Sequence, residues 1–146
     1  MKSKEMRRIL VVEDSSSTRA FVRGILETED FSQALGGVEV VEAASGFDAM
    51  RLLPRGPYEL VITDINMVDI NGLELVRFVR MSAQYRTTPL VIISTQGTEK
   101  DVERGLALGA NAYLAKPFSP EALRATCLKV LGLGPVLSGP DQAPNG

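Results

Sequence analysis

Residues 60–76, "LVITDINMVDINGLELV", hold the pattern on which the prediction of the fold depends most. An apolar run typical of a buried strand leads directly into Asp64, and an Asn71-Gly72 pair follows before an amphipathic run with helical spacing. A carboxylate at the end of a buried strand is costly unless it is paired, hydrogen-bonded or bound to a cation. Asp64 therefore either caps the loop that follows or belongs to a functional site. Turn chemistry alone explains Asp69, in the same loop.

Short apolar runs alternate with amphipathic runs on both sides of this stretch. The spacing predicts strands at residues 8–12, 38–43, 58–63, 89–93 and 112–115, and helices at 15–29, 46–54, 72–82, 98–109 and 119–131. Five strand–helix units in alternation predict an α/β domain with a doubly wound, five-stranded parallel sheet and helices on both faces. Such sheets place their functional sites at the carboxyl ends of the strands.

The bulk properties predict one soluble domain. We expect a domain at residues 8–131, an N-terminal extension at 1–7 and a disordered tail at 132–146, which is rich in Gly and Pro. The net charge of −2 gives no field that attracts nucleic acid, and no apolar run is long enough to insert into a membrane. The single cysteine, Cys127, cannot form an internal disulfide, which favours a cytoplasmic location.

The residue types restrict the chemistry. The chain has no histidine, which excludes Ser-His-Asp and Cys-His catalysis and any metal site that uses histidine. Any reaction must therefore use carboxylates, hydroxyls, lysine or a hard metal ion.

Polar side chains stand where four of the predicted strands end: Glu13-Asp14, Asp64, Ser94-Thr95 and Lys116-Pro117. In a parallel sheet these ends meet at one edge, where carboxylates about 4 Å apart repel each other by about 4 kcal/mol per pair. They need cations. Lys116 supplies one positive charge, and a set of oxygen ligands suits Mg²⁺. A carboxylate can also attack phosphorus to form an aspartyl phosphate, while a metal ion, Lys116 and the hydroxyl of Ser94 neutralise the phosphoryl oxygens.

Four segments resemble the receiver domain of bacterial response regulators: "ILVVEDSSSTR" (9–19), "LVITDINM" with "NGLEL" (60–67 and 71–75), "PLVIISTQ" (89–96) and "GANAYLAKPF" (109–118). The resemblance runs from about Arg8 to Leu131. It implies a CheY-like, flavodoxin-like fold with strand order 2-1-3-4-5. It also implies a phosphorylation-activated signalling switch, of the two-component or chemotaxis type, that receives its phosphoryl group from a sensor histidine kinase or a phosphotransfer protein.

The resemblance implies a role for each strand-end residue. Asp64 matches the phosphoacceptor, Ser94 the switch hydroxyl, Lys116 the lysine that pairs with phosphate and precedes a cis proline, and Tyr113 the aromatic that moves inward on activation. Asp14, Asp64 and the backbone carbonyl of Asn66 match the Mg²⁺ ligands, and Glu13 acts through water. Val68 departs from the family, which usually has proline there, and this loosens the loop.

The resemblance also implies an output surface. A downstream protein would read the face formed by helix 98–109, strand 112–115 and helix 119–131. Helix 98–109 has few large apolar residues and carries Gly105 in its middle, so it is expected to be one of the less stable helices.

One alternative function is not expected from the residues, and two others remain open. A turnover enzyme is not expected, because an aspartate-nucleophile phosphohydrolase would carry a second acid two residues after Asp64, where Asn66 stands. A receiver-like interaction module that works without phosphorylation remains open. So does a receiver cut from a larger regulator whose effector domain is missing.

Overall fold

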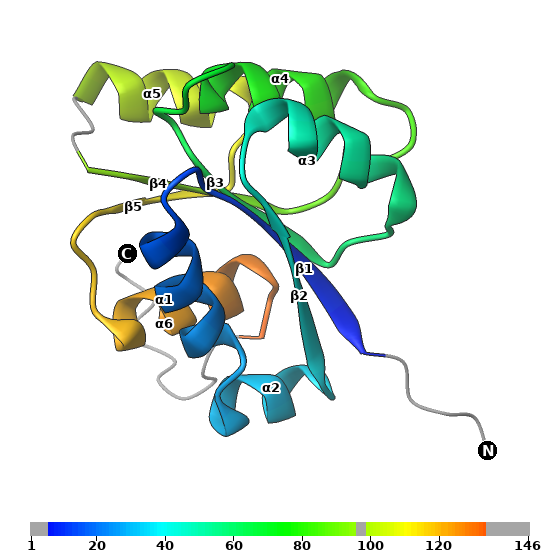
Figure 1. Ribbon diagram of the computed structural model, residues 1–146, viewed down its shortest axis with the longest axis vertical. Helices are drawn as coiled ribbons and strands as arrows, with labels where there is room; N and C mark the ends of the chain where they lie inside the picture. Colours follow the sequence, from blue (N-terminus) through cyan, green and yellow to red (C-terminus); the bar gives the residue numbers. More distant parts are fainter. Residues whose placement is uncertain (1–5, 96–98, 134–146) are drawn as a thin grey trace.

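The computed structural model describes residues 6–95 and 99–133. In chain order the elements are β1 (Arg7–Val12), α1 (Ser16–Leu26), α2 (Glu29–Leu35), β2 (Val38–Ala43), α3 (Gly46–Leu52), a short 3-10 helix (Leu53–Arg55), β3 (Leu60–Asp64), α4 (Gly72–Met81), β4 (Leu90–Ser94), α5 (Glu99–Leu108), β5 (Ala112–Ala115) and α6 (Pro120–Val130). Figure 1 shows the sheet between two layers of helices. Within the described ranges, no helix is long and apolar enough to cross a membrane.

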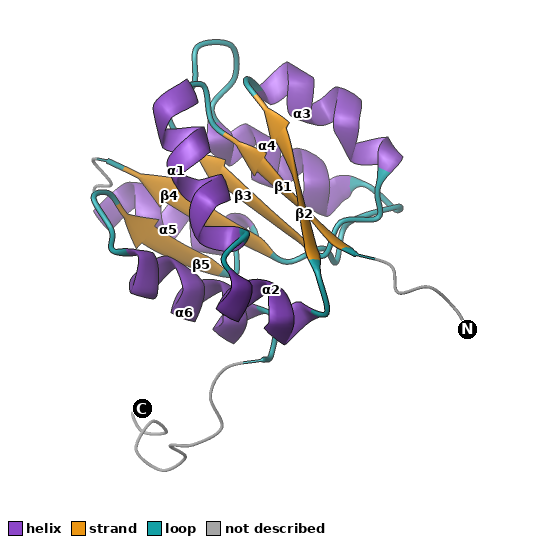
Figure 2. Cartoon of the chain, turned by 60° about the horizontal axis from the view of Figure 1, so that its bottom comes forward, coloured by secondary structure: helices purple, strands orange, loops and turns teal. Residues whose placement is uncertain are grey.

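The strands form one parallel sheet in the order β2-β1-β3-β4-β5 (Figure 2), which confirms the predicted fold class and strand order. The strand 38–43, whose polar alternation suits an edge, does lie at the edge of the sheet. From β1 the chain first adds β2 on one side and then adds β3, β4 and β5 on the other side, so the order of strands reverses between β1 and β3. This makes their carboxyl ends the topological switch point, where doubly wound sheets bind ligands.

Each face of the sheet is covered by three helices. Helices α1, α2 and α6 cover one face over a core that includes Val11, Phe31 and Ile62, and α3, α4 and α5 cover the other over a core that includes Leu10 and Ile92. The central strands are buried on both faces, because successive side chains point to opposite sides and both sides meet helices.

The structure corrects the prediction of one helix over residues 15–29. Helix α1 ends at Leu26, and a second helix, α2, packs Phe31 and Leu35 against the sheet. A turn at Thr28 separates them, where the Thr28 hydroxyl donates to the carbonyl of Ile25 at 2.8 Å. The strict alternation of single helices and strands is therefore broken once. Because α2 is an additional helix, the labels of all later helices increase by one. The expected output face, which was predicted at residues 98–109, 112–115 and 119–131, therefore corresponds to α5, β5 and α6.

Several boundaries differ slightly from the predicted ones. Strand β1 begins at Arg7, and β3 begins at Leu60 and includes Asp64. At the other end, the Gly132 N–H donates to the carbonyl of Lys129 at 3.0 Å and the Leu133 N–H to that of Leu128 at 2.7 Å. These two residues of the expected tail therefore close α6 as a Schellman cap, with Gly132 at φ +75°. Residues 134–146 and 1–5 lie outside the described ranges.

Two local expectations concern α5 and α6. In α5, Gly105 is the buried residue and Leu106 is 46% exposed, which agrees with the sparse apolar content of this helix. A Cβ at Gly105 would lie 2.6 Å from Cδ1 of Ile92, so the glycine lets α5 approach β4. Cys127 is fully buried in α6, and burial raises the pKa of its thiol to about 12, as expected for a small core residue.

Candidate functional site

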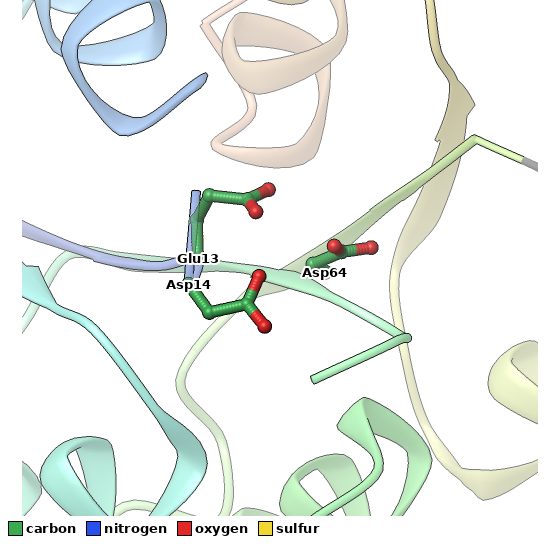
Figure 3. A group of neighbouring side chains, drawn as sticks. All are labelled: Glu13, Asp14 and Asp64. Carbon is green, nitrogen blue, oxygen red and sulfur yellow. The ribbon is translucent and has the colours of Figure 1, made fainter. Parts of the chain in front are cut away.

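Three carboxylates converge at the carboxyl ends of β1 and β3. Glu13 and Asp14 follow β1 directly, and Asp64 is the last residue of β3. One carboxylate oxygen from each lies within 4.8 Å of the others, and Figure 3 shows the three side chains extending into the same space. Glu13 and Asp64 are buried, with 1% and 5% of their surfaces exposed, whereas Asp14 is exposed. The predicted gathering of strand-end acids is therefore present.

Asp64 is held by its own loop. Its Oδ1 accepts the N–H of Ile65 at 2.7 Å and that of Asn66 at 3.4 Å. The chain then closes a compact loop, because the Gly72 N–H donates to the carbonyl of Ile65 at 2.7 Å. These contacts orient the carboxylate so that Oδ2 faces Lys116, whose Nζ is 3.4 Å away.

Lys116 neutralises part of the acidic cluster. Its Nζ lies 2.9 Å from Oε1 of Glu13 and 3.4 Å from Oδ2 of Asp64, so it bridges the ends of β1 and β3. Burial raises the pKa of Glu13 above its usual range, although hydrogen bonds from Lys116 and from the Ser15 N–H oppose this. Burial by itself lowers the Lys116 pKa, but the hydrogen bond to Glu13 and the charge of Asp64 outweigh it and raise the pKa. The lysine is therefore positively charged at neutral pH.

The remaining predicted residues lie on β4, on β5 and in the loops that follow β3 and β5. Ser94 ends β4 beside Asp64, since Ile93 pairs with Asp64 in the sheet register. The Ser94 hydroxyl is fully buried and has no hydrogen-bond partner among the described residues. The buried hydroxyl of Tyr113, on β5, likewise lacks a partner within the described part of the chain. Asn66 is exposed in the loop after β3, and the peptide bond between Lys116 and Pro117 is cis, as the resemblance implied.

The donor set fits a hard divalent cation. One lysine cannot balance three carboxylates, and the exposed Asp14 leaves the cluster open to solvent on one side. Carboxylate oxygens with open coordination positions suit Mg²⁺, which keeps several of its waters. The unpartnered Ser94 hydroxyl adds a donor at the same edge of the sheet, where a bound oxyanion would satisfy it.

Comparisons with known proteins show the family of this chain. The response regulator receiver domain matches residues 9–128. The chain belongs to the response regulator receiver family. A chemotaxis protein CheY homolog of Campylobacter jejuni is 38% identical over 128 residues, which are 87% of this chain and 94% of the relative. Chemotaxis protein CheY1 of Helicobacter pylori is 36% identical, over 86% of this chain and 97% of the relative.

Solved receiver structures confirm the fold. The chemotaxis response regulator CheY4 of Vibrio cholerae superposes with a TM-score of 0.75 at 36% identity, covering 86% of this chain and 99% of that one. The family match over residues 9–128 includes all the strand-end residues described above. The chain is therefore a CheY-like receiver domain of the phosphorylation-type signalling switches.

Two residues near this receiver site were not assigned a part in it from the sequence. A Cβ at Gly72 would lie 2.0 Å from the backbone oxygen of Asp64, so the start of α4 rests directly on Asp64. Asp69 makes contacts with the start of α3 in addition to the turn within its own loop. The Asn71-Gly72 pair signalled a turn, but nothing in the local sequence signals either long-range contact.

The repulsion among the three carboxylates predicts that removing one of them increases the stability of the metal-free protein. Asp14→Asn is expected to stabilise the metal-free receiver by about 1 kcal/mol, because it removes a charge close to two buried carboxylates while solvent screens part of the effect. Urea unfolding in EDTA measures this. The same variant should gain less stability from added Mg²⁺ than the wild type does.

The matched control is Asp30→Asn, an exposed acid of α2. It should change the unfolding free energy by less than about 0.5 kcal/mol in EDTA and leave the response to Mg²⁺ intact. A destabilised Asp14→Asn protein in EDTA would show that the carboxylates do not repel one another as described.

Proposed function

We propose that this receiver domain is a phosphorylation-controlled signalling switch in which Asp64 accepts a phosphoryl group from a phosphohistidine donor. The observation that carries the proposal is the charge arrangement around Asp64. A buried nucleophilic carboxylate lies close to Lys116, to two further acids and to a buried hydroxyl on the neighbouring strand that has no partner among the described residues. These are the groups that phosphoryl transfer to a carboxylate needs.

Asp64 would react through Oδ2. The Ile65 N–H already occupies Oδ1, whereas Oδ2 has only Lys116 as a described hydrogen-bond neighbour. In the transfer, Oδ2 forms a bond to phosphorus while the bond from phosphorus to the imidazole nitrogen breaks, and that nitrogen keeps the electron pair. Asp14, Asp64 and the Asn66 carbonyl would hold Mg²⁺, with Glu13 acting through water. The metal ion supplies positive charge for the phosphoryl oxygens.

Lys116 and Ser94 would stabilise the product. Lys116 bridges Glu13 and Asp64 before transfer, and a phosphoryl group on Oδ2 offers it an oxygen with more negative charge. The Ser94 hydroxyl would gain its missing partner by donating to another phosphoryl oxygen. Satisfying a buried hydroxyl favours the phosphorylated arrangement by about 1–3 kcal/mol.

The output would pass through α5, β5 and α6. Drawing Ser94 toward the phosphoryl group moves the end of β4, and α5, which follows it, is weakly anchored. Tyr113 has a buried, unpartnered hydroxyl on β5 and would repack with this movement. The protein would shift between two arrangements of these elements, and the added charge of the phosphoryl group would favour one of them. A downstream protein would bind the phosphorylated form at this face.

A protein phosphodonor has an apolar place to dock beside the site. Phe21 of α1 is 47% exposed, and its ring centroid lies 5.9 Å from that of Phe118. Together with Thr18, Thr95, Lys116 and Pro117 they line a surface hollow of about 360 Å³. An exposed apolar surface adjoining Lys116 suits contact with a sensor histidine kinase or phosphotransfer protein.

The test is the reaction itself. The protein is incubated with acetyl phosphate and Mg²⁺, and its intact mass is recorded with and without EDTA. A gain of one phosphoryl group that requires Mg²⁺ and is lost in alkali, as an acyl phosphate is, supports the switch and a stoichiometric reaction without turnover. A folded protein that binds Mg²⁺ but gains no phosphoryl group would contradict the proposal and favour a phosphate-independent module.

A further inference from the structure

The loop between β3 and α4 is fastened to a different part of the fold through one side chain. Asp69 Oδ1 accepts the N–H of Gly46 at 3.1 Å and that of Ile70 at 2.7 Å. Its Oδ2 accepts the N–H of Phe47 at 2.9 Å. Gly46 and Phe47 begin α3, so a carboxylate from the acceptor loop satisfies the free N–H groups at the start of a helix more than twenty residues earlier.

The contact is close as well as polar. A Cβ at Gly46 would lie 2.1 Å from Cγ1 of Ile70, so only glycine lets the loop rest on the start of α3. Hydrogen bonds from the N–H groups of Phe47, Gly46 and Ile70 lower the pKa of Asp69 to about 2. The side chain is therefore ionised throughout the neutral range, which keeps the contact constant.

The position of this contact matters because of what the loop carries. Asp64 and Asn66 stand at its start, and Asp69 lies near its far end. Between them, Val68 is 90% exposed and gives the loop no packing contact of substance. At its start the loop is held by the bond from the Ile65 N–H to Asp64. The Asp69 contacts fix the other side, so the segment that includes Asn66 is stretched between two anchors.

We propose that Asp69 is a positioning residue that holds the Asn66 backbone carbonyl in place as a cation ligand by fastening the acceptor loop to α3. This inference rests on the proposed function, because it assigns Asn66 to the cation site of the switch. Asp69 touches neither the cation nor the phosphoryl group. In place of the rigidity that a proline would give at position 68, the loop of this chain has a contact with a neighbouring helix.

The test measures Mg²⁺ binding directly, by isothermal titration calorimetry without any phosphodonor. Asp69→Ala should bind Mg²⁺ about tenfold more weakly than the wild type, a loss typical of removing a group that orients a metal ligand. Asp69→Asn keeps one carboxamide oxygen for the loop and helix N–H groups, so it should recover part of the affinity. With acetyl phosphate, Asp69→Ala should need more Mg²⁺ for half-maximal rate yet approach the wild-type rate at saturation.

The matched control is Asp48→Ala. Asp48 also stabilises the start of α3, by accepting the N–H of Ala44 at 3.2 Å and pairing with Arg51, but it does not touch the acceptor loop. Its Mg²⁺ affinity should equal that of the wild type, while its unfolding free energy falls. Equal weakening in Asp48→Ala and Asp69→Ala would show that α3 stability is the cause and would overturn the inference.

The two proposals fail separately. Wild-type affinity in a folded Asp69→Ala protein overturns the positioning role while phosphorylation of the wild type still stands. A wild type that binds Mg²⁺ but gains no phosphoryl group contradicts the switch, whereas the calorimetry still decides whether Asp69 sets the affinity. If Asp69→Ala does not fold, the test uses Asp69→Asn alone. The inference is then overturned if this variant has the Mg²⁺ affinity of the wild type and needs the same Mg²⁺ concentration for half-maximal phosphorylation rate.

Discussion

Replacing Asp64 by Asn is expected to abolish phosphorylation. The carboxamide keeps the oxygen that accepts the Ile65 N–H, so the loop retains its geometry. The nitrogen that replaces the second oxygen is not a nucleophile toward phosphorus under these conditions, and it cannot pair with Lys116. Intact mass after incubation with acetyl phosphate and Mg²⁺ should show no labile phosphoryl group, against one per chain in the wild type.

Two comparisons make this result specific to Asp64. Asp30→Asn makes the same change of charge on the surface of α2, and it should be phosphorylated like the wild type. Asp64→Asn should also remain folded, because Lys116 keeps its 2.9 Å contact with Glu13. A labile phosphoryl group on a folded Asp64→Asn protein would place the acceptor elsewhere and contradict the roles assigned to Lys116 and Ser94.

Replacing Gly72 by Ala is expected to produce the largest loss of stability among these changes. The added methyl group would lie 2.0 Å from the backbone oxygen of Asp64 and 2.8 Å from Cα of Ile65. Backbone atoms cannot rotate away as a flexible side chain can, so α4 must move off the end of β3. Overpacking of this kind costs about 3 kcal/mol, which urea denaturation measures as a lower unfolding midpoint.

Gly24→Ala is the matched control for Gly72→Ala. Gly24 is an exposed residue of α1, and a Cβ there would meet nothing within 4 Å. The same substitution should therefore stabilise the protein, by about 0.5–1 kcal/mol, because alanine has the higher helix propensity. A loss below about 1 kcal/mol in Gly72→Ala would show that the start of α4 tolerates displacement and does not rest on Asp64.

The contrast between these glycines shows where local sequence ceases to be informative. Asn71 before Gly72 signals a turn that Gly24 lacks, but nothing in the neighbours of either glycine along the chain shows whether a Cβ would have room. Gly72 is required because β3 ends beneath the first turn of α4, which is a fact of packing. Gly105 and Gly46 are similar, since each faces a side chain from a separate element, Ile92 and Ile70 respectively.

Helix α2 escaped prediction for a different reason. The sequence contained signals for this helix: Phe31 and Leu35 stand at helical spacing, and a glycine, Gly36, follows them. In the structure Gly36 adopts φ +78° after the last turn, as a helix-ending glycine does. Seven residues are too few for periodicity to separate a helix from a loop, and the preceding run at helical spacing extends naturally to Glu29. Contact of Phe31 with the core is what stabilises so short a helix.

The parallel sheet, its helical layers and the gathering of Glu13, Asp14, Asp64 and Lys116 at one edge could all be predicted from the order of residues in the chain. Alternating apolar runs permit few other arrangements, and parallel strands must all end on the same side. Three contacts could not be predicted from the sequence: Lys116 lies closer to Glu13 than to Asp64, α4 rests on Asp64, and Asp69 accepts N–H groups at the start of α3. These contacts join segments distant in the chain, and their distances depend on how whole helices pack against the sheet.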